Sequence, residues 1–187
     1  MRCQLPGKLM LASALLFAGT AFAATRNTTA GPTTDAQVAN KVAHEIRMYS
    51  RYTIWDNVSL RVNNGDVELI GQVSQPFKKQ DLQRIVASAP GVRSVTNDLK
   101  VLPNSFFDDQ LRVQVARAIY RDPVLSRYAI QAVPPIHIIV DNGHVTLEGV
   151  VNNELEKNVA FARASGAGLS FGQVTNNLRV ENPKTKG

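Results

Sequence analysis

A twelve-residue pattern that occurs twice constrains the fold of this chain more than any other feature. It reads Leu-Arg-Val-Asn-Asn-Gly-Asp-Val-Glu-Leu-Ile-Gly at 60–71 and Ile-Ile-Val-Asp-Asn-Gly-His-Val-Thr-Leu-Glu-Gly at 138–149. In each copy an Asn-Gly pair separates two runs of alternating apolar residues. The pairs Asn64-Gly65 and Asn142-Gly143 suit the two positive-φ positions of a type I′ turn, so both stretches are predicted to be β-hairpins.

Counting outward from each turn gives the expected register of the strands. In the first hairpin Val62 is opposite Val67 and Leu60 is opposite Leu69. The second hairpin repeats these pairs as Val140 with Val145 and Ile138 with Leu147. Because alternate residues of a strand lie on the same face, each hairpin has one continuous apolar face that another part of the chain must cover.

Two glycines occupy the next position on these apolar faces. Gly71 is expected opposite Val58, and Gly149 opposite Ile136. A glycine inside a strand usually marks a close approach of another backbone, which we interpret as a helix lying across the sheet. Both glycines are therefore expected to have a structural role and no catalytic one.

The first 23 residues are predicted to be a secretory signal peptide. Arg2 and Lys8 form a basic start, residues 9–17 are an apolar run, and Ala21-Phe22-Ala23 is a cleavage signal of the A-x-A type. A membrane anchor is disfavoured because the run is too short for a hydrocarbon layer of about 30 Å. Cleavage near Ala23 leaves a mature chain with no transmembrane segment, which begins with a leader at 24–34 that is expected to be disordered.

Cysteine content and charge exclude several classes of protein. Cys3 is the only cysteine and lies in the predicted signal peptide, so disulfides, thiol catalysis and cysteine metal sites are excluded from the mature chain. After Ala23 there are 19 basic and 15 acidic residues, a net charge of +4. This excess is compatible with weak attraction to anionic lipid, and the chain lacks the basic runs of a nucleic-acid-binding protein.

Helices are predicted around each hairpin, in the order αββαβ. In the first copy a helix starts at Thr34 or Asp35, and a second starts at Pro76, with Lys78 on its water-facing side, and leads to a strand at 92–101. The third strand is expected to pair in parallel with the second, because a helix connects them. The predicted fold is therefore α+β: two units, each a three-stranded mixed sheet with two helices on one face. The predicted bounds are 35–103 for the first unit, 106–181 for the second and 182–187 for a frayed tail.

Both units resemble BON domains. The motif N-G-x-V-x-L-x-G-x-V occurs at 64–73 and again at 142–151. After a helix, the motif G-V-x-x-V-x-N-x-L follows at 91–99, and 174–178 repeats its second part. The resemblance implies the αββαβ fold, no enzymatic activity and a role in contacting phospholipid membranes. An exported chain with two copies is similar to osmotically inducible proteins of the bacterial envelope, which implies a periplasmic protein, soluble or associated peripherally with the outer membrane.

The residues show no catalytic, cofactor-binding or metal-binding pattern. His44 is placed on a polar helix face, His137 on the solvated outer face of its sheet and His144 beside a turn, without the spacing of metal ligands. Asp108-Asp109 is better interpreted as the cap of a helix N-terminus than as a catalytic dyad.

The helix before the second hairpin is apolar on two sides, unlike its counterpart in the first copy. Its core stripe contains Leu111 and Val115, and a second stripe lies on the far side. Aromatic and basic residues accompany this second stripe, a mixture suited to lipid headgroups. The candidate contact residues are Phe106, Phe107, Val113, Arg117, Tyr120, Arg121 and Arg127. The alternative is that the two units pack on each other through this helix.

The sequence therefore predicts a non-enzymatic, exported envelope protein that binds anionic phospholipid surfaces peripherally and supports envelope integrity or stress tolerance. A periplasmic adaptor that binds another envelope protein, through the same helix or the edge of a sheet, is the alternative function.

Overall fold

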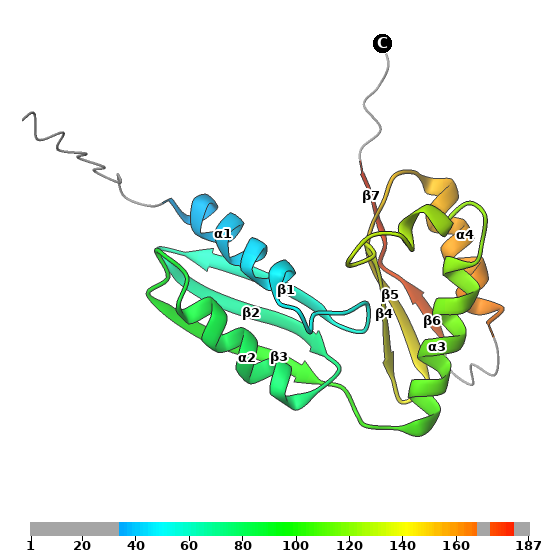
Figure 1. Cartoon of the computed structure of the whole chain (residues 1–187), viewed down its shortest axis with the longest axis horizontal. Helices are drawn as coiled ribbons and strands as arrows, with labels where there is room; N and C mark the ends of the chain where they lie inside the picture. Colours follow the sequence, from blue (N-terminus) through cyan, green and yellow to red (C-terminus); the bar gives the residue numbers. More distant parts are fainter. Residues whose placement is uncertain (1–33, 168–172, 182–187) are drawn as a thin grey trace, which may run out of the picture. The chain divides into compact units, whose positions relative to one another are not determined.

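The structure, a computed structural model, describes residues 34–167 and 173–181 (Figure 1). The predicted signal peptide, the leader up to residue 33 and the tail lie outside these ranges, as do residues 168–172 of a glycine-rich connection in the second unit. All described residues belong to the same unit of the chain. Within it, two copies of one arrangement follow each other.

The first copy has a mixed three-stranded sheet with β2 in the centre. Strand β2 pairs antiparallel with β1 and parallel with β3, so the expected parallel pair is confirmed. The helices bury their apolar stripes on the same face of this sheet. The elements are α1 (Asp35–Met48), β1 (Asn57–Asn63), β2 (Asp66–Val73), α2 (Pro76–Ala87) and β3 (Ser94–Val101).

The second copy repeats this order, with its last strand divided in two. Short strands β6 and β7 both pair in parallel with β5, where the αββαβ order predicts one strand. The break lies at Asn177 and Leu178, between the end of β6 and the start of β7. The elements are α3 (Phe106–Tyr120), the short 3-10 helix η1 (Ser126–Tyr128), β4 (Ile136–Asp141), β5 (His144–Val151), α4 (Glu154–Ser165), β6 (Val174–Asn176) and β7 (Arg179–Val180).

Each copy has its own hydrophobic core between its sheet and its helices. Leu69 and Leu82 are fully buried in the first core, and Leu147 and Ile119 are fully buried in the second. At about 1.5 to 3 kcal/mol for each fully buried large side chain, these cores are the main source of stability. The α+β fold with two αββαβ units is thus confirmed.

The hairpins have the register that counting from their turns predicts. Val62 pairs with Val67 and Leu60 with Leu69 in the first, and the second hairpin has the equivalent pairs. Asn64 and Gly65 have φ values of 52° and 82°, and Asn142 and Gly143 have 51° and 79°. Positive φ at both central positions is what a type I′ turn requires.

An aspartate in the first turn of the preceding helix holds each Asn-Gly turn. The two carboxylate oxygens of Asp108 accept hydrogen bonds from the backbone N–H groups of Asn142 and Gly143, at 3.0 and 2.8 Å. Asp35 does the same for the turn of the first copy. The expected capping role of Asp108 is therefore wrong: Ser105 is the N-cap of α3, and its hydroxyl accepts from the N–H of Asp108.

The interpretation of Gly71 and Gly149 is corrected in one respect. The backbone that approaches them belongs to β1 at Gly71 and to the residue just before β4 at Gly149, and not to a helix. A Cβ at Gly71 would lie 2.1 Å from the carbonyl oxygen of Asn57, and one at Gly149 would lie 1.9 Å from that of Pro135. Their φ values of 126° and 121° are a second reason why only glycine fits.

The side chain of Lys78 is buried, whereas helical periodicity places it in water. Its ammonium group lies 2.6 Å from Oδ2 of Asp56, which is completely buried before β1. Ser74 donates to the other oxygen of this carboxylate through its backbone N–H and its hydroxyl. A buried charge requires such partners, and those of Lys78 lie on other elements, which periodicity cannot reveal.

Candidate functional site

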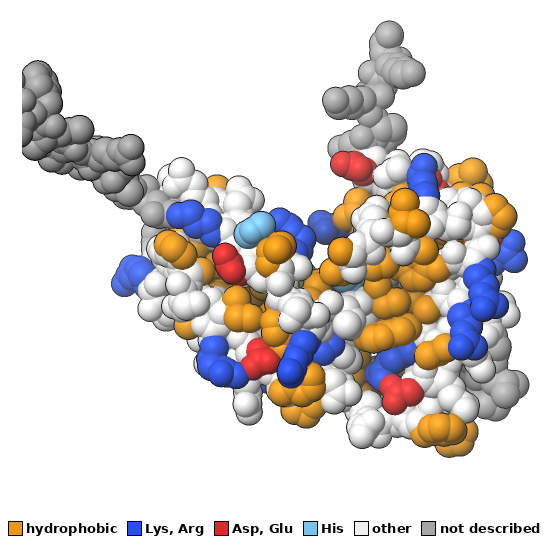
Figure 2. Space-filling view, in the orientation of Figure 1, with side chains coloured by type: hydrophobic (Ala, Val, Ile, Leu, Met, Phe, Trp, Pro, Cys, Tyr) orange, Lys and Arg blue, Asp and Glu red, His pale blue; other side chains and the backbone are white. Residues whose placement is uncertain are grey.

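The exposed side of α3 carries the basic and aromatic residues that the sequence singles out. We call Phe106, Phe107, Val113, Arg117 and Arg121 the α3 stripe. At 100° per residue they fall within an arc of about 120°, so they occupy one side of the helix. Figure 2 shows blue, basic side chains over the region of α3 and α4.

Two phenylalanines form the N-terminal end of the α3 stripe. The Ser105 cap fixes the start of the helix and leaves Phe106 and Phe107 in its first turn, outside the core. They are 71% and 80% exposed, and their rings pack edge to face with centroids 6.2 Å apart. Covering large apolar side chains with this exposure by another surface is favourable, because it removes apolar area from water.

Arginines form the C-terminal end of the stripe. Arg117 and Arg121 line a shallow hollow of about 320 Å³ together with Arg163 of α4 and Asp122. Arg163 binds Asp122 through its Nε at 2.6 Å, whereas neither Arg117 nor Arg121 has an ion pair within the described ranges. The backbone N–H of Val124 and the Arg163 guanidinium lower the pKa of the Asp122 carboxyl. The hollow therefore has a surplus of positive charge suited to a phosphate group.

Sequence reasoning did not identify Arg163 as part of this cluster. The residue lies 42 positions after Arg121, on a helix whose pattern matched α2 of the first copy. Only the packing of α4 beside α3 brings it to the hollow. Comparison of the two copies in sequence does not indicate that Arg163 lies near Arg117 and Arg121.

Tyr120 and Arg127 are not part of the α3 stripe: Tyr120 is partly buried, and Arg127, whose side chain is 52% exposed, lies beyond α3 in η1. The Tyr120 hydroxyl donates to the carbonyl oxygen of Ile136 at 2.5 Å, and burial raises the pKa of this phenol. Arg127 forms an ion pair with buried Glu156 and stacks over the ring of Tyr128 at 5.2 Å. Both side chains are thus occupied by contacts that stabilise the second copy.

The segment before β1 contacts the second copy, which bears on the alternative role of α3. The backbone N–H of Ile138 donates to the carbonyl oxygen of Ile54 at 2.7 Å, and Ile54 and Trp55 pack against the second core. Lys100 and Asp141 add an ion pair between the copies at 2.5 Å. This packing supports the alternative that the two copies contact each other near the middle of α3, where Trp55 and Val113 line the same pocket.

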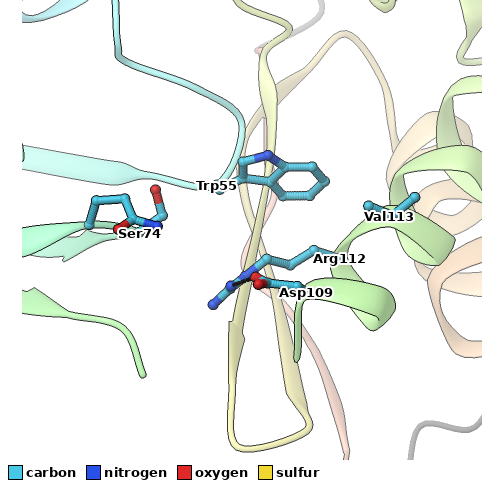
Figure 3. Close-up of a pocket in the computed structure, with 6 residues that line it drawn as sticks. Trp55, Ser74, Asp109, Arg112 and Val113 are labelled. Atoms are coloured by element: carbon cyan, nitrogen blue, oxygen red, sulfur yellow. Dashed lines mark hydrogen bonds and ion pairs between the residues drawn. The ribbon is translucent and has the colours of Figure 1, made fainter. Parts of the chain in front are cut away.

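That pocket lies between Trp55 and the first half of α3 (Figure 3). It has a volume of about 210 Å³, and Ser74, Gln75, Asp109 and Arg112 complete its lining. Arg112 is buried because it donates to the carbonyl oxygen of Val140 at 2.8 Å and binds Asp109. The guanidinium of Arg112 is therefore engaged by the second sheet and by Asp109.

His137 is half-buried, where the sequence indicated a solvated position. Its ring lies 5.5 Å from that of Tyr52, and burial lowers its pKa. The expectation was wrong because the segment before β1 covers this part of the outer sheet face. His44 and His144 are exposed, and no group of three His, Asp or Glu side chains within residues 34–167 and 173–181 is arranged to hold a metal ion.

Among the helices of the described residues, none is both long and apolar enough to cross a membrane.

Two sequential αββαβ units, each with an Asn-Gly hairpin held by an aspartate, define a protein built of a duplicated small α+β domain. The BON domain matches residues 34–103 and again residues 107–182. The chain therefore belongs to the BON domain family.

Comparison with other known proteins adds little to this assignment. No curated protein matches the chain. A solved structure of the C-terminal domain of CdsD, the structural protein of the type III secretion system of Chlamydia trachomatis, is 15% identical with a TM-score of 0.31. That match covers 79% of this chain and 66% of the other. A second CdsD structure from the same organism is 16% identical over 76% of this chain and 92% of the other, with a TM-score of 0.27.

Proposed function

We propose that this protein binds anionic phospholipid surfaces peripherally through the α3 stripe. The observation that carries the proposal is the exposure of Phe106 and Phe107 on the same side of one helix as Arg117 and Arg121. The corresponding side of α1 has Asn40, Lys41 and His44 and no aromatic residue. Membrane association of BON domains supports the proposal at the level of the family.

The geometry suits a helix that lies flat on the headgroup layer. With a rise of about 1.5 Å per residue, the 15 residues of α3 extend about 22 Å. The phenylalanines at one end insert into the boundary of the acyl chains, and the arginines at the other bind phosphates. Each arginine contributes about 1 kcal/mol near an anionic surface, so the binding is weak and reversible and depends on salt.

The wider role follows from the family and from the predicted signal peptide. BON domain proteins are generally non-enzymatic and typically belong to the periplasm or the envelope. We infer an exported, non-enzymatic protein of the cell envelope that supports envelope integrity under stress such as osmotic stress. Cell fractionation tests the location, because the mature protein is expected in the periplasmic fraction.

Flotation with vesicles tests the membrane contact. The wild-type protein is expected to float with vesicles that contain phosphatidylglycerol and to remain at the bottom with pure phosphatidylcholine. Phe106→Ala/Phe107→Ala and Arg117→Gln/Arg121→Gln are each expected to lower the floating fraction several-fold, and salt is expected to release the protein.

A matched control separates the α3 stripe from the charge of the whole protein. Lys41→Gln/Arg47→Gln removes the same two charges from α1 and is expected to leave flotation nearly unchanged. Equal losses for the two pairs of basic residues would show that net charge alone attracts the protein, which contradicts the proposal.

Binding of a protein partner is a second candidate function. One specific observation favours it: the outer edge of β1 is open, whereas the equivalent edge of β4 is covered.

A further inference from the structure

The outer edge of β4 is covered at three alternate residues, 136, 138 and 140. The hydroxyl of Tyr120 donates to the carbonyl oxygen of Ile136 at 2.5 Å. The N–H of Ile138 donates to Ile54, and the carbonyl oxygen of Val140 accepts from the guanidinium of Arg112 at 2.8 Å. These groups point away from β5, so the second sheet presents little free backbone for another strand.

The first copy lacks the residues that cover this edge. In the alignment of the two helices, Ala39 occupies the position of Arg112, and Arg47 that of Tyr120. Leu60 and Val62 have no hydrogen-bond partner for their outward N–H and C=O groups within the part of the chain that the structure describes.

A groove of about 760 Å³ runs beside this open edge. Val58 and Leu60 line one side, and the opposite side consists of the loop at 131–135 and the outer face of the second sheet. The groove therefore lies between β1 and the second copy, and an extended segment beside β1 would contact both walls. At about 3.3 Å per residue, the seven residues of β1 offer an edge of about 23 Å.

The charges in the groove favour an acidic occupant. Arg47 from α1 and Arg179 from β7 line it, and neither has an ion pair within the described ranges. Glu148 is the one acidic residue of the lining, and it accepts a hydrogen bond from Asn177. Val58, Leu60, Val133 and Val150 supply apolar surface.

We propose that this groove binds an extended segment of a partner protein, with alternating apolar and acidic residues, which adds a strand to β1. Main-chain hydrogen bonds to Leu60 and Val62 provide the affinity, and the two arginines select acidic side chains. The proposal is independent of lipid binding, because none of these residues belongs to the α3 stripe.

The test uses the mature chain and two synthetic hexapeptides with blocked ends, Val-Glu-Val-Asp-Val-Glu and its counterpart with lysine at each acidic position. NMR measures hydrogen exchange at individual amides during titration of each peptide. The acidic peptide is expected to bind and to slow exchange at Leu60 and Val62 by about tenfold or more, and the lysine peptide to have no effect.

Three variants identify the groove as the binding site. Arg47→Glu/Arg179→Glu is expected to weaken binding about tenfold or more, whereas Lys41→Glu, on the same helix outside the groove, leaves it unchanged. Leu60→Pro removes one outward N–H, which an edge strand tolerates, and is expected to weaken binding of the acidic peptide. Thermal unfolding verifies that each variant folds.

Several results would overturn the proposal. These are the absence of acidic-peptide binding at about 1 mM, binding that Arg47→Glu/Arg179→Glu leaves unchanged, or equal binding of both peptides. Amides of Leu60 and Val62 that are protected without peptide and lose protection on deletion of residues 24–33 would show that the chain's own leader occupies the edge. Protection that depends on protein concentration would assign the edge to a second copy.

Discussion

Oδ1 of Asp108 lies 2.8 Å from the backbone nitrogen of Gly143, which donates a hydrogen bond to it. This contact joins the first turn of α3 to the hairpin turn 35 residues later, and Asp35 joins α1 to Gly65 at 2.9 Å in the same way. A charged acceptor for two turn N–H groups stabilises the positive-φ conformation. Both copies thus use one carboxylate to fix the helix on its hairpin.

Removal of this carboxylate is expected to destabilise the second copy more than the first. Asp108→Ala should lower the free energy of unfolding by about 1.5 to 3 kcal/mol, because two turn N–H groups lose a charged acceptor in a buried place. Asp35→Ala should cost less, since that site is more exposed. Urea unfolding measures both, and Glu45→Ala on the exposed side of α1 is the control. Equal small effects of all three substitutions would contradict the assigned role.

Removal of one partner of the buried ion pair between Asp56 and Lys78 is expected to destabilise the first copy. Asp56→Ala leaves the Lys78 ammonium buried without a counter-charge and should cost about 3 to 5 kcal/mol. The double variant Asp56→Ala/Lys78→Met should recover part of this loss, because an apolar side chain of similar length tolerates the site. Urea unfolding of the single and double variants provides the measurement. If the double variant is as unstable as Asp56→Ala, the unpaired charge is not the cause.

Tyr120 is expected to act through the sheet and not through lipid. Tyr120→Phe removes the hydrogen bond to Ile136 and should lower the free energy of unfolding by about 1 kcal/mol. Flotation with anionic vesicles should not change, because the ring is retained and the α3 stripe is intact. A loss of flotation with little loss of stability would place Tyr120 at the membrane instead.

His137 makes stability depend on pH. Burial lowers its pKa in the folded chain, so between that pKa and about 6.5 the unfolded chain binds more protons. Neutral His137 should therefore make its full contribution to the free energy of unfolding above about pH 6.5. This contribution should be lost as the pH falls toward the pKa of His137 in the folded chain. The urea midpoint between pH 7.5 and pH 5 should fall more for the wild type than for His137→Gln, which cannot titrate. Parallel curves would contradict this role of burial.

The sequence alone was sufficient for features that depend on neighbours along the chain. An Asn-Gly turn fixes its own φ angles, and alternation fixes which side chains share a face, so strand pairs such as Leu60 with Leu69 could be counted in advance. The second apolar side of α3 was also visible as a pattern. Periodicity could not show which parts of that side remain exposed, because the covering residues lie elsewhere in the chain.

Contacts between distant segments decided the rest. Lys78 can be buried because its ammonium group binds the carboxylate of Asp56, a residue 22 positions earlier in the chain. His137 is covered by Tyr52 from the other copy. Tyr120 is not part of the candidate site, because its hydroxyl donates a hydrogen bond to the carbonyl oxygen of Ile136 at the edge of β4. Local patterns thus determined the two αββαβ units and their hairpins. Only the tertiary structure decided which charges are buried, which arginines remain free of ion pairs among the described residues and which sheet edge stays open, since each depends on a partner that the chain brings close only by folding.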